Sequence, residues 1–317
     1  MKIERVYRFS SRIYVAILIP SFLGVFVSTT EEPRWEHDLA SFSKLSTKPQ
    51  PSPSYLSQNC AKSITDSMAT CSSEKEQALV VYNPDPLLAS LHETEHEFRL
   101  EWTGTGRSLP DSVKLQQGGR GTGATTWAAG YILATFIAKY HSNMEEKLPR
   151  TFVEVVKTRG QEFKFEDRTV VELGAGLGLV SIVLGMLGSR VVSTDGDETV
   201  IPFLAKNVRA YRQHMKHVVK VARLHWGSSE DVQLCMSRLP AEGVEGGTTV
   251  DIIMAADVVF GQDTRVWEAL LATMLKLSHR GTIIFFGYSS RYDLDKKFVE
   301  SLSEYFLTAE IPSEDWR

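Results

Sequence analysis

Cysteine is scarce in this chain of 317 residues, which contains only Cys60, Cys71 and Cys235. An odd count without metal-ligand spacing argues against both a disulfide framework and a zinc site. The histidines also lack the spacing of a metal centre or a catalytic triad. We therefore expect ordinary reduced thiols and no metal.

The chain also lacks an excess of positive charge and a long apolar run. Its net charge is −4 and its pI about 6.1, so no nucleic-acid partner is expected. The longest apolar stretch runs from Ile13 to Val27 and is interrupted only by Ser21 among polar residues. As a helix it would measure roughly 22 Å, short of the ~30 Å hydrocarbon core of a membrane.

The N-terminal 89 residues differ in composition from the rest. Four basic residues precede the apolar run, which is the pattern of a signal peptide. Residues 41–73 contain ten serines and a single acid, Asp66, and such a segment buries too little apolar surface to fold. Three interpretations stay open for this region: a cleavable targeting segment, a membrane anchor or an incidental N-terminus. We expect a targeting-like segment over 1–30, a Ser-rich linker over 31–89 and one domain over 90–317, so that a chain starting at Ser90 would fold and bind its ligand.

A dinucleotide fingerprint is absent, but a related glycine motif is present. The stretch from Glu172 reads Glu-Leu-Gly-Ala-Gly-Leu-Gly, with Gly174, Gly176 and Gly178 at every second position. The dinucleotide motif would require its third glycine at position 179, which is a leucine. Closely spaced glycines let the backbone pass under a ligand and turn into a helix whose first N–H groups face that ligand.

Acidic residues around this motif indicate the kind of ligand. Asp195 ends the next apolar strand, where its carboxylate can accept the hydroxyls of a ribose, with Asp197 as an alternative. Glu172 stands directly before the glycine turn, where a carboxylate suits a cationic ligand better than a pyrophosphate. These residues predict a site for a nucleoside-bearing, positively charged cofactor.

The rest of the chain alternates strands and helices. This alternation predicts an α/β fold with a doubly wound, mostly parallel sheet, preceded by a β-hairpin within residues 96–116. Ligands of such sheets bind beyond the carboxyl ends of the strands, where Gly174, Asp195, Trp226 and Asp257 fall. The glycine-rich stretch 118–123 lacks the features of a phosphate cradle and is interpreted as a flexible lead-in to the helix that follows.

Four elements in this order resemble a known family. They are Thr126-Trp127-Ala-Ala at the start of a helix, the glycine motif, Leu224-His-Trp226-Gly after the third strand and Asp257-Val-Val-Phe260 after the fourth. The chain resembles seven-strand S-adenosylmethionine-dependent methyltransferases, and within them the methyltransferase-like protein-lysine methyltransferases. The resemblance covers residues 98–312 and implies a Rossmann-like class I fold. It also implies two final antiparallel strands, of which the sequence offers only one, at 307–311, so the seventh strand is expected to be missing.

The resemblance also implies roles for individual residues. Asp257 would accept a hydrogen bond from the substrate amine, and Phe260 would line the substrate channel. The expected cofactor-binding residues are Trp127, Glu172, Gly174, Gly176, Gly178, Asp195, Trp226 and Ala256, and the expected cofactor is S-adenosylmethionine. A turn cap for Asp257 and ordinary core packing for Phe260 and the two tryptophans remain the alternative interpretations.

The function expected from the resemblance is direct methyl transfer to a lysine side chain of a protein. A small-molecule or nucleic-acid methyltransferase and a non-catalytic cofactor-binding module remain alternatives. We expect a monomer that acts in the cytoplasm. An organellar or membrane-associated location would follow if the N-terminal segment were a true targeting signal.

Overall fold

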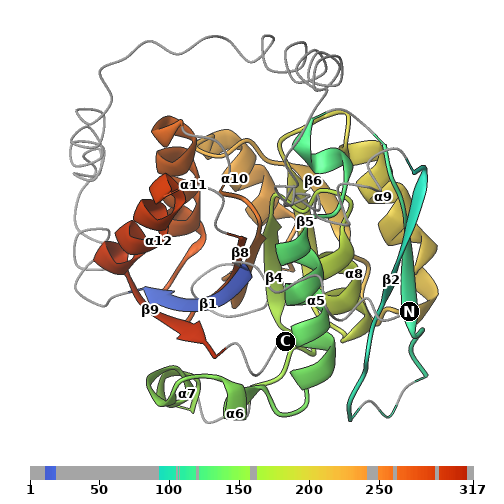
Figure 1. Ribbon diagram of the computed structural model, residues 1–317, viewed down its shortest axis with the longest axis horizontal. Helices are drawn as coiled ribbons and strands as arrows, with labels where there is room; N and C mark the ends of the chain where they lie inside the picture. Colours follow the sequence, from blue (N-terminus) through green and yellow to red (C-terminus); the bar gives the residue numbers. More distant parts are fainter. Residues whose placement is uncertain are drawn as a thin grey trace, which may run out of the picture. The chain divides into compact units, whose positions relative to one another are not determined.

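The computed structural model describes residues 11–18, 93–104, 106, 108–118, 121–157, 163–240, 249–259, 263–289 and 293–312. They form a seven-stranded sheet flanked by helices, and a separate two-stranded hairpin (Figure 1). The strand order in the large sheet is β6-β5-β4-β7-β8-β1-β9. The expected doubly wound, mostly parallel sheet is confirmed.

The parallel part of the sheet consists of five strands rich in branched apolar residues. These are β4 (Thr169–Leu173), β5 (Arg190–Asp195), β6 (Lys220–Arg223), β7 (Ile252–Ala256) and β8 (Ile283–Ser289). Every residue of β4 and β8 is buried, as expected for parallel strands covered by helices on both faces.

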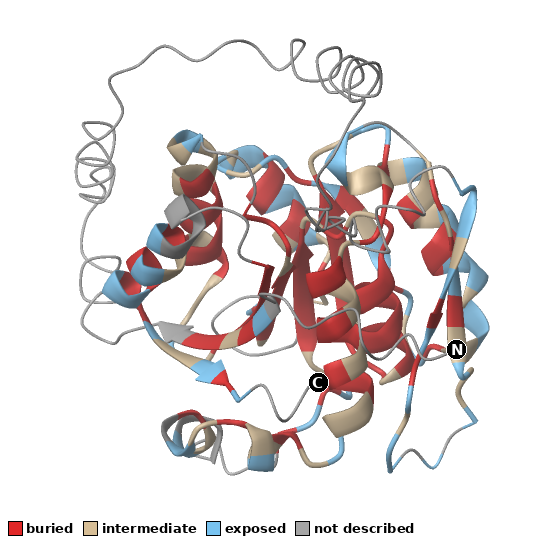
Figure 2. Cartoon of the chain, in the orientation of Figure 1, coloured by how far each residue is buried: buried red, intermediate tan, exposed pale blue. Residues whose placement is uncertain are grey.

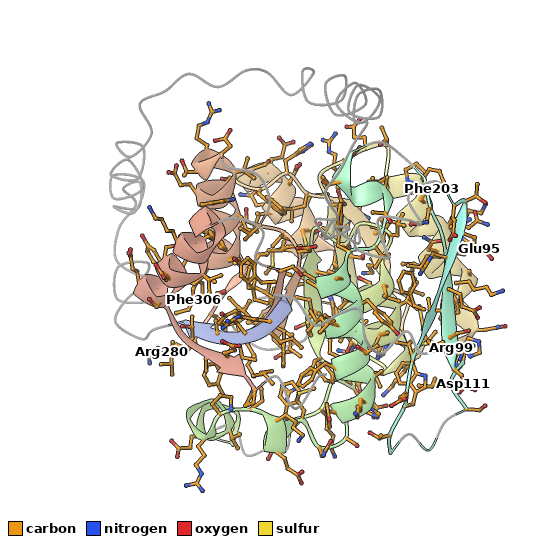
Figure 3. All side chains as sticks on the ribbon, viewed as in Figure 1. Glu95, Arg99, Asp111, Phe203, Arg280 and Phe306 are labelled. Atoms are coloured by element: carbon orange, nitrogen blue, oxygen red, sulfur yellow. The ribbon has the colours of Figure 1, made fainter. Side chains whose placement is uncertain are left out.

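The antiparallel end of the sheet corrects the expectation of a missing strand. β9 (Phe306–Ile311) does not pair with β8 directly, because β1 (Ser11–Leu18) lies between them and is antiparallel to both. Figure 3 labels Phe306 where β9 begins, and Phe306 is paired there with Leu18 of β1. The seventh strand thus comes from the N-terminal apolar run. The sequence concealed it because it lies far from its partners and resembles the apolar part of a signal peptide.

Strand β1 also bears on the domain boundary expected at residue 90, because β1 lies before it. A domain that begins at residue 90 would lack one strand of the sheet. No helix among the described residues is long and apolar enough to cross a membrane. The linker expected over residues 31–89 falls within residues 19–92, which lie outside the described residues.

Helices cover both faces of the sheet (Figure 1). One face carries α5 (Ala128–Tyr140), α8 (Leu179–Met186) and α9 (Ile201–Ala210), and the other carries α10 (Ser229–Ser237), α11 (Thr264–Leu277) and α12 (Asp293–Tyr305). Two shorter helices, α6 (Met144–Lys147) and α7 (Arg150–Lys157), follow α5. Short 3-10 helices span Thr122–Ala124 (η5) and Arg212–His214 (η6).

The core lies between the sheet and its helices. Helix α8 is buried along its whole length, as Figure 2 shows in red. On α5 the spacing of Leu133, Phe136, Ile137 and Tyr140 predicts one buried face, and the first three are fully buried whereas Tyr140 is half-buried. These apolar contacts hold the carboxyl ends of β4, β5 and β7 at one edge of the sheet, and that edge carries the candidate site.

The expected N-terminal hairpin is confirmed as β2 (Glu95–Arg99) and β3 (Ser112–Gln116). Figure 3 labels Glu95 and Arg99 on it. The side chain of Asn207 on α9 accepts the N–H of Gln116 at 2.8 Å and donates to its carbonyl at 3.0 Å. The hairpin is thereby fastened to α9 and leads the chain toward the glycine-rich segment before α5.

Candidate active site

A cavity of about 850 Å³ opens at the carboxyl ends of β4, β5, β6 and β7. Its volume is in the range of small-molecule and cofactor sites. The residues singled out from the sequence that border it are Trp127, Glu172, Gly174, Gly176, Asp195, Trp226, Ala256 and Asp257. Five separate stretches of sequence therefore meet at one site, and four of them lie at or after the ends of neighbouring strands.

The glycine motif divides into two functions. Gly174 has a φ of 64°, and a Cβ added to it would lie 2.8 Å from Cγ1 of Val258 and 3.3 Å from Cζ2 of Trp226. Gly178 has a φ of 91° but does not border the cavity, and its Cβ would lie 2.5 Å from Cδ1 of Leu204 on α9. Gly174 therefore keeps the cavity open, whereas Gly178 serves the packing of α9 on α8, and its expected cofactor contact has no support in the geometry.

Asp195 is buried at the end of β5 and bound to the glycine loop. Its Oδ2 accepts the N–H of Gly176 at 2.8 Å, and its Oδ1 accepts the N–H of Asp197 at 2.9 Å. Burial is the largest influence on its carboxyl and raises its pKa, against the effect of these N–H groups. Both oxygens retain lone pairs for further donors.

Asp197, the alternative acid, has a different local task. Its Oδ1 accepts the N–H and the hydroxyl of Thr199, both at 2.8 Å, in a turn before α9. It borders the cavity but is more exposed than Asp195. This arrangement favours Asp195 as the ribose-binding acid, which remains a prediction.

Glu172 lies on β4 below the glycine turn. Its carboxylate accepts a hydrogen bond from the hydroxyl of Ser181 on α8, and that hydroxyl also lies 2.7 Å from the hydroxyl of Ser193 on β5. Burial raises the pKa of Glu172 to about 8, the hydrogen bonds of Ser181 oppose this rise, and the nearby Asp195 adds to it. The side chain is therefore largely a neutral acid at pH 7 that borders the cavity.

Asp257 follows β7 in a backbone conformation that is uncommon for a residue with a side chain. Its φ is 58°, and its N–H donates to the carbonyl of Gly287 at 2.8 Å. It is buried and borders the cavity. The N-cap of the next helix, α11, is Asp263, whose side chain accepts the N–H of Arg265, so Asp257 is not that helix's cap. Phe260, its expected catalytic partner, lies outside the described residues.

The two tryptophans are half-buried residues of the cavity wall rather than core residues. Trp127 stands before the first turn of α5, and its indole N–H donates to the carbonyl of Thr122 at 2.7 Å. Trp226 follows β6 and places its ring beside Gly174. Both side chains line the cavity, and an aromatic wall suits an adenine ring or a sulfonium.

Sequence reasoning missed a second wall of the site. Thr122 and Gly123 border the cavity, and a Cβ on Gly123 would lie 3.6 Å from Oδ2 of Asp195. The stretch 118–123, interpreted from the sequence as a flexible lead-in to α5, therefore also contributes Thr122 and Gly123 to the cavity wall. The glycine spacing of this stretch was the available signal in the sequence. Its role in the site becomes visible only in the structure, where η5 lies beside the end of β5.

Further wall residues follow β6 and open α11. His225 borders the cavity with its Nδ1 3.0 Å from Oδ2 of Asp231, and Asp263 and Arg265 border it from α11. Nothing in their sequence spacing distinguishes them from surface residues. No group of three or more potential metal ligands occurs in the part of the chain that the structure describes.

Comparison with known proteins adds the family. Residues 111–305 match the family model described as lysine methyltransferase. The protein N-lysine methyltransferase METTL21A of Danio rerio is 29% identical over 239 residues, which cover 74% of this chain and 89% of that protein. The protein-lysine N-methyltransferase EFM6 of Saccharomyces cerevisiae is 29% identical over 227 residues, covering 68% of this chain and 84% of that protein.

Among solved structures, the 16S rRNA N2 G1207 methyltransferase of T. thermophilus is similar to this chain, with 18% identity and a TM-score of 0.38. The match covers 69% of this chain and 51% of that protein.

The family model spans more than half of the sequence, and its range includes the glycine motif, Asp195, Trp226 and Asp257. The chain belongs to the lysine methyltransferase family of S-adenosylmethionine-dependent enzymes.

Proposed function

We propose that this enzyme transfers a methyl group from S-adenosylmethionine to the side-chain amine of lysine in a protein substrate. The observation that carries the proposal is the position of Asp257, a buried carboxylate that borders the same cavity as the glycine loop and Asp195. One side of the cavity suits a nucleoside, and the other offers an acceptor for an N–H group. The names of the relatives, as protein-lysine methyltransferases, support a protein as substrate.

The residues present fit S-adenosylmethionine. Gly174 leaves room where a side chain would enter the cavity, and the buried Asp195 offers lone pairs to ribose hydroxyls. Trp127 and Trp226 offer aromatic surface to the adenine and sulfonium parts. When bound, this cofactor supplies a methyl group activated by the positive charge on sulfur.

The task of the protein is then to deliver a neutral amine in line with that methyl group. A lysine with a pKa of ~10.4 must lose its proton, which costs about 4 kcal/mol at pH ~7.4. Desolvation in the cavity lowers that cost, because burial disfavours the ammonium. The Asp257 carboxylate accepts an N–H of the amine and directs the nitrogen lone pair at the methyl carbon. The amine nitrogen would take the methyl group as sulfur leaves with the electron pair of the C–S bond, and the product ammonium would release its proton.

Methyl incorporation tests this proposal. Purified enzyme is incubated with S-adenosylmethionine labelled in its methyl group and a protein extract, and acid hydrolysates are analysed for methylated lysine. Label in methyl-lysine is the expected result. Label confined to nucleic acid or small molecules would move the activity to another substrate class, and no label with intact cofactor binding would favour a non-catalytic binding module.

The proposal extends to the oligomeric state and the cellular location of the enzyme. We propose a monomer that acts in the cytoplasm, based on the family resemblance and on the use of residues 11–18 in the sheet rather than in a membrane. Light scattering after size-exclusion chromatography tests the first point, and a fluorescent fusion at the C-terminus tests the second. An organellar signal combined with a shortened N-terminus would contradict the proposed location.

A further inference from the structure

Strand β1 places an N-terminal segment inside the sheet, between β8 and β9. Ile13 is opposite Gly287 of β8 on one side and Ile311 of β9 on the other. Its side chain is fully buried and belongs to the same apolar cluster as Leu133 of α5. Eight residues near the start of the chain therefore hold together two strands from its second half, β8 and β9, and the helix that packs on them.

Gly287 is the link between β1 and the candidate catalytic residue. On the side away from Ile13 it is paired with Ala256, and its carbonyl accepts the N–H of Asp257 at 2.8 Å. That hydrogen bond holds Asp257 at a φ of 58°, a conformation that persists only where the surroundings enforce it. A shift of Gly287 would move the backbone that aims the Asp257 carboxylate.

Helix α5 approaches the same point. A Cβ on Gly287 would lie 3.1 Å from the carbonyl oxygen of Ala129 and 3.4 Å from Cβ of Leu133. Directly opposed residues of an antiparallel pair project to the same face of the sheet, so the side chain of Ile13 lies beside this contact. Ile13 thus supports Gly287 both through the strand pairing and by filling space next to α5.

We propose that Ile13 is a positioning residue for methyl transfer, acting through Gly287 on Asp257, and that the active enzyme therefore retains residues 11–18. The inference rests on the proposed role of Asp257. It assigns to the N-terminal apolar run a part in turnover and not only in folding. Removal of this segment would leave cofactor-binding residues on β4, β5 and β6 in place but release the strand beside Asp257.

Two alanine substitutions in the full-length chain separate an effect on the position of Asp257 from an effect on stability. Ile13→Ala removes buried carbon next to Gly287, whereas Val15→Ala removes buried carbon on the same face, opposite Phe285 and two residues away. Two residues of strand correspond to roughly 6.5 Å, far enough to leave the pairing at Gly287 intact. Ile13→Val is the conservative variant, and Asp257→Asn is measured beside them.

We expect both alanine variants to denature at lower urea concentration than the wild type. At a temperature where all are folded, Ile13→Ala should lose at least ~10-fold in kcat with KM and the cofactor Kd within about 2-fold, as for a group displaced from its productive geometry. Val15→Ala should keep kcat within about 2-fold, and Ile13→Val should recover most of it.

Equal kcat losses in Ile13→Ala and Val15→Ala, or an unchanged kcat in Ile13→Ala, would overturn the positioning role. If Ile13→Ala does not fold, Ile13→Val is compared with Val15→Ala instead, and a kcat in Ile13→Val no lower than that of Val15→Ala would overturn it as well. Full activity of Asp257→Asn would instead remove Asp257 from the mechanism, and a wild type that transfers no methyl group to protein would refute the proposed function, so these failures can be told apart.

Discussion

The backbone N–H of Gly176 donates a 2.8 Å hydrogen bond to Oδ2 of Asp195, which joins the glycine loop to the acid at the end of the neighbouring strand. Both residues border the cavity. The loop and the acid therefore form one unit in which the carboxylate is oriented before any ligand enters. Such preorganisation lowers the ordering cost of binding.

Asp195→Ala should weaken S-adenosylmethionine binding by about 1.5–3 kcal/mol, the cost of losing hydrogen bonds to a charged group. The fold should survive, because the apolar residues of β5 remain in place. Calorimetric titration measures the change, with Asp197→Ala as the matched control. If Asp197→Ala weakens binding and Asp195→Ala does not, the ribose contact belongs to Asp197.

The parallel part of the fold was accessible from the sequence because each element carries its own local signal. Period and length predicted β4 to β8 and the helices α8, α9 and α11 but not α10, and the acids after the strands marked the cavity edge. Strand β1 was not accessible in this way. Its pairing with β8 and β9 depends on partners more than 250 positions away, and its composition is equally suited to a signal peptide.

The site was predictable to the same extent. Gly174, Asp195, Trp226 and Asp257 have motif signals and all border the cavity. The glycine spacing around Thr122 was interpreted as a flexible lead-in, and Arg265 has no motif signal, because its place in the wall depends on how α11 approaches the sheet. Gly178, also a glycine of the motif, packs against Leu204 and does not border the cavity, and its cofactor contact stays a prediction.

Stability should fall as pH rises because of Glu172. Its pKa is about 8 in the folded protein against an ordinary 4.5, so between these values the folded state binds more protons than the unfolded state. The free energy of unfolding then decreases with pH by up to ~1.4 kcal/mol per unit, and Glu172→Gln should flatten that slope. Urea denaturation at several pH values between 5 and 8 tests this, and an equal slope in the variant would assign the dependence to other groups.

Binding of the positively charged cofactor should be coupled to release of a proton from Glu172. A sulfonium in the cavity favours the ionised form of Glu172, so S-adenosylmethionine should release close to one proton at pH ~7, whereas the neutral thioether product should release almost none. Titration calorimetry in two buffers of different ionisation enthalpy counts the protons. Glu172→Gln is the control, and proton release that persists in it would point to Asp195.

Gly178→Ala and Gly174→Ala should have different effects, although both glycines have a positive φ. The Gly178 variant should lose about 1–3 kcal/mol of stability through its clash with Leu204 and keep cofactor affinity. The Gly174 variant should lose affinity by at least ~10-fold, because the new methyl group enters the cavity wall. Denaturation and calorimetry on the same preparations distinguish them, and equal loss of affinity in both folded variants would return Gly178 to the binding site.

Asp257 separates catalysis from cofactor binding. Asn has nearly the same shape as Asp, so Asp257→Asn should preserve the strained backbone at φ 58° and most of the cofactor affinity. It replaces a charged acceptor by a neutral amide, which should lower turnover by at least ~10²-fold if the carboxylate aligns the amine. Phe260→Ala should lose less, because the expected role of that residue is to line the channel. Methyl incorporation into protein is measured beside cofactor Kd, and an Asn variant that methylates lysine at the wild-type rate would remove Asp257 from the mechanism.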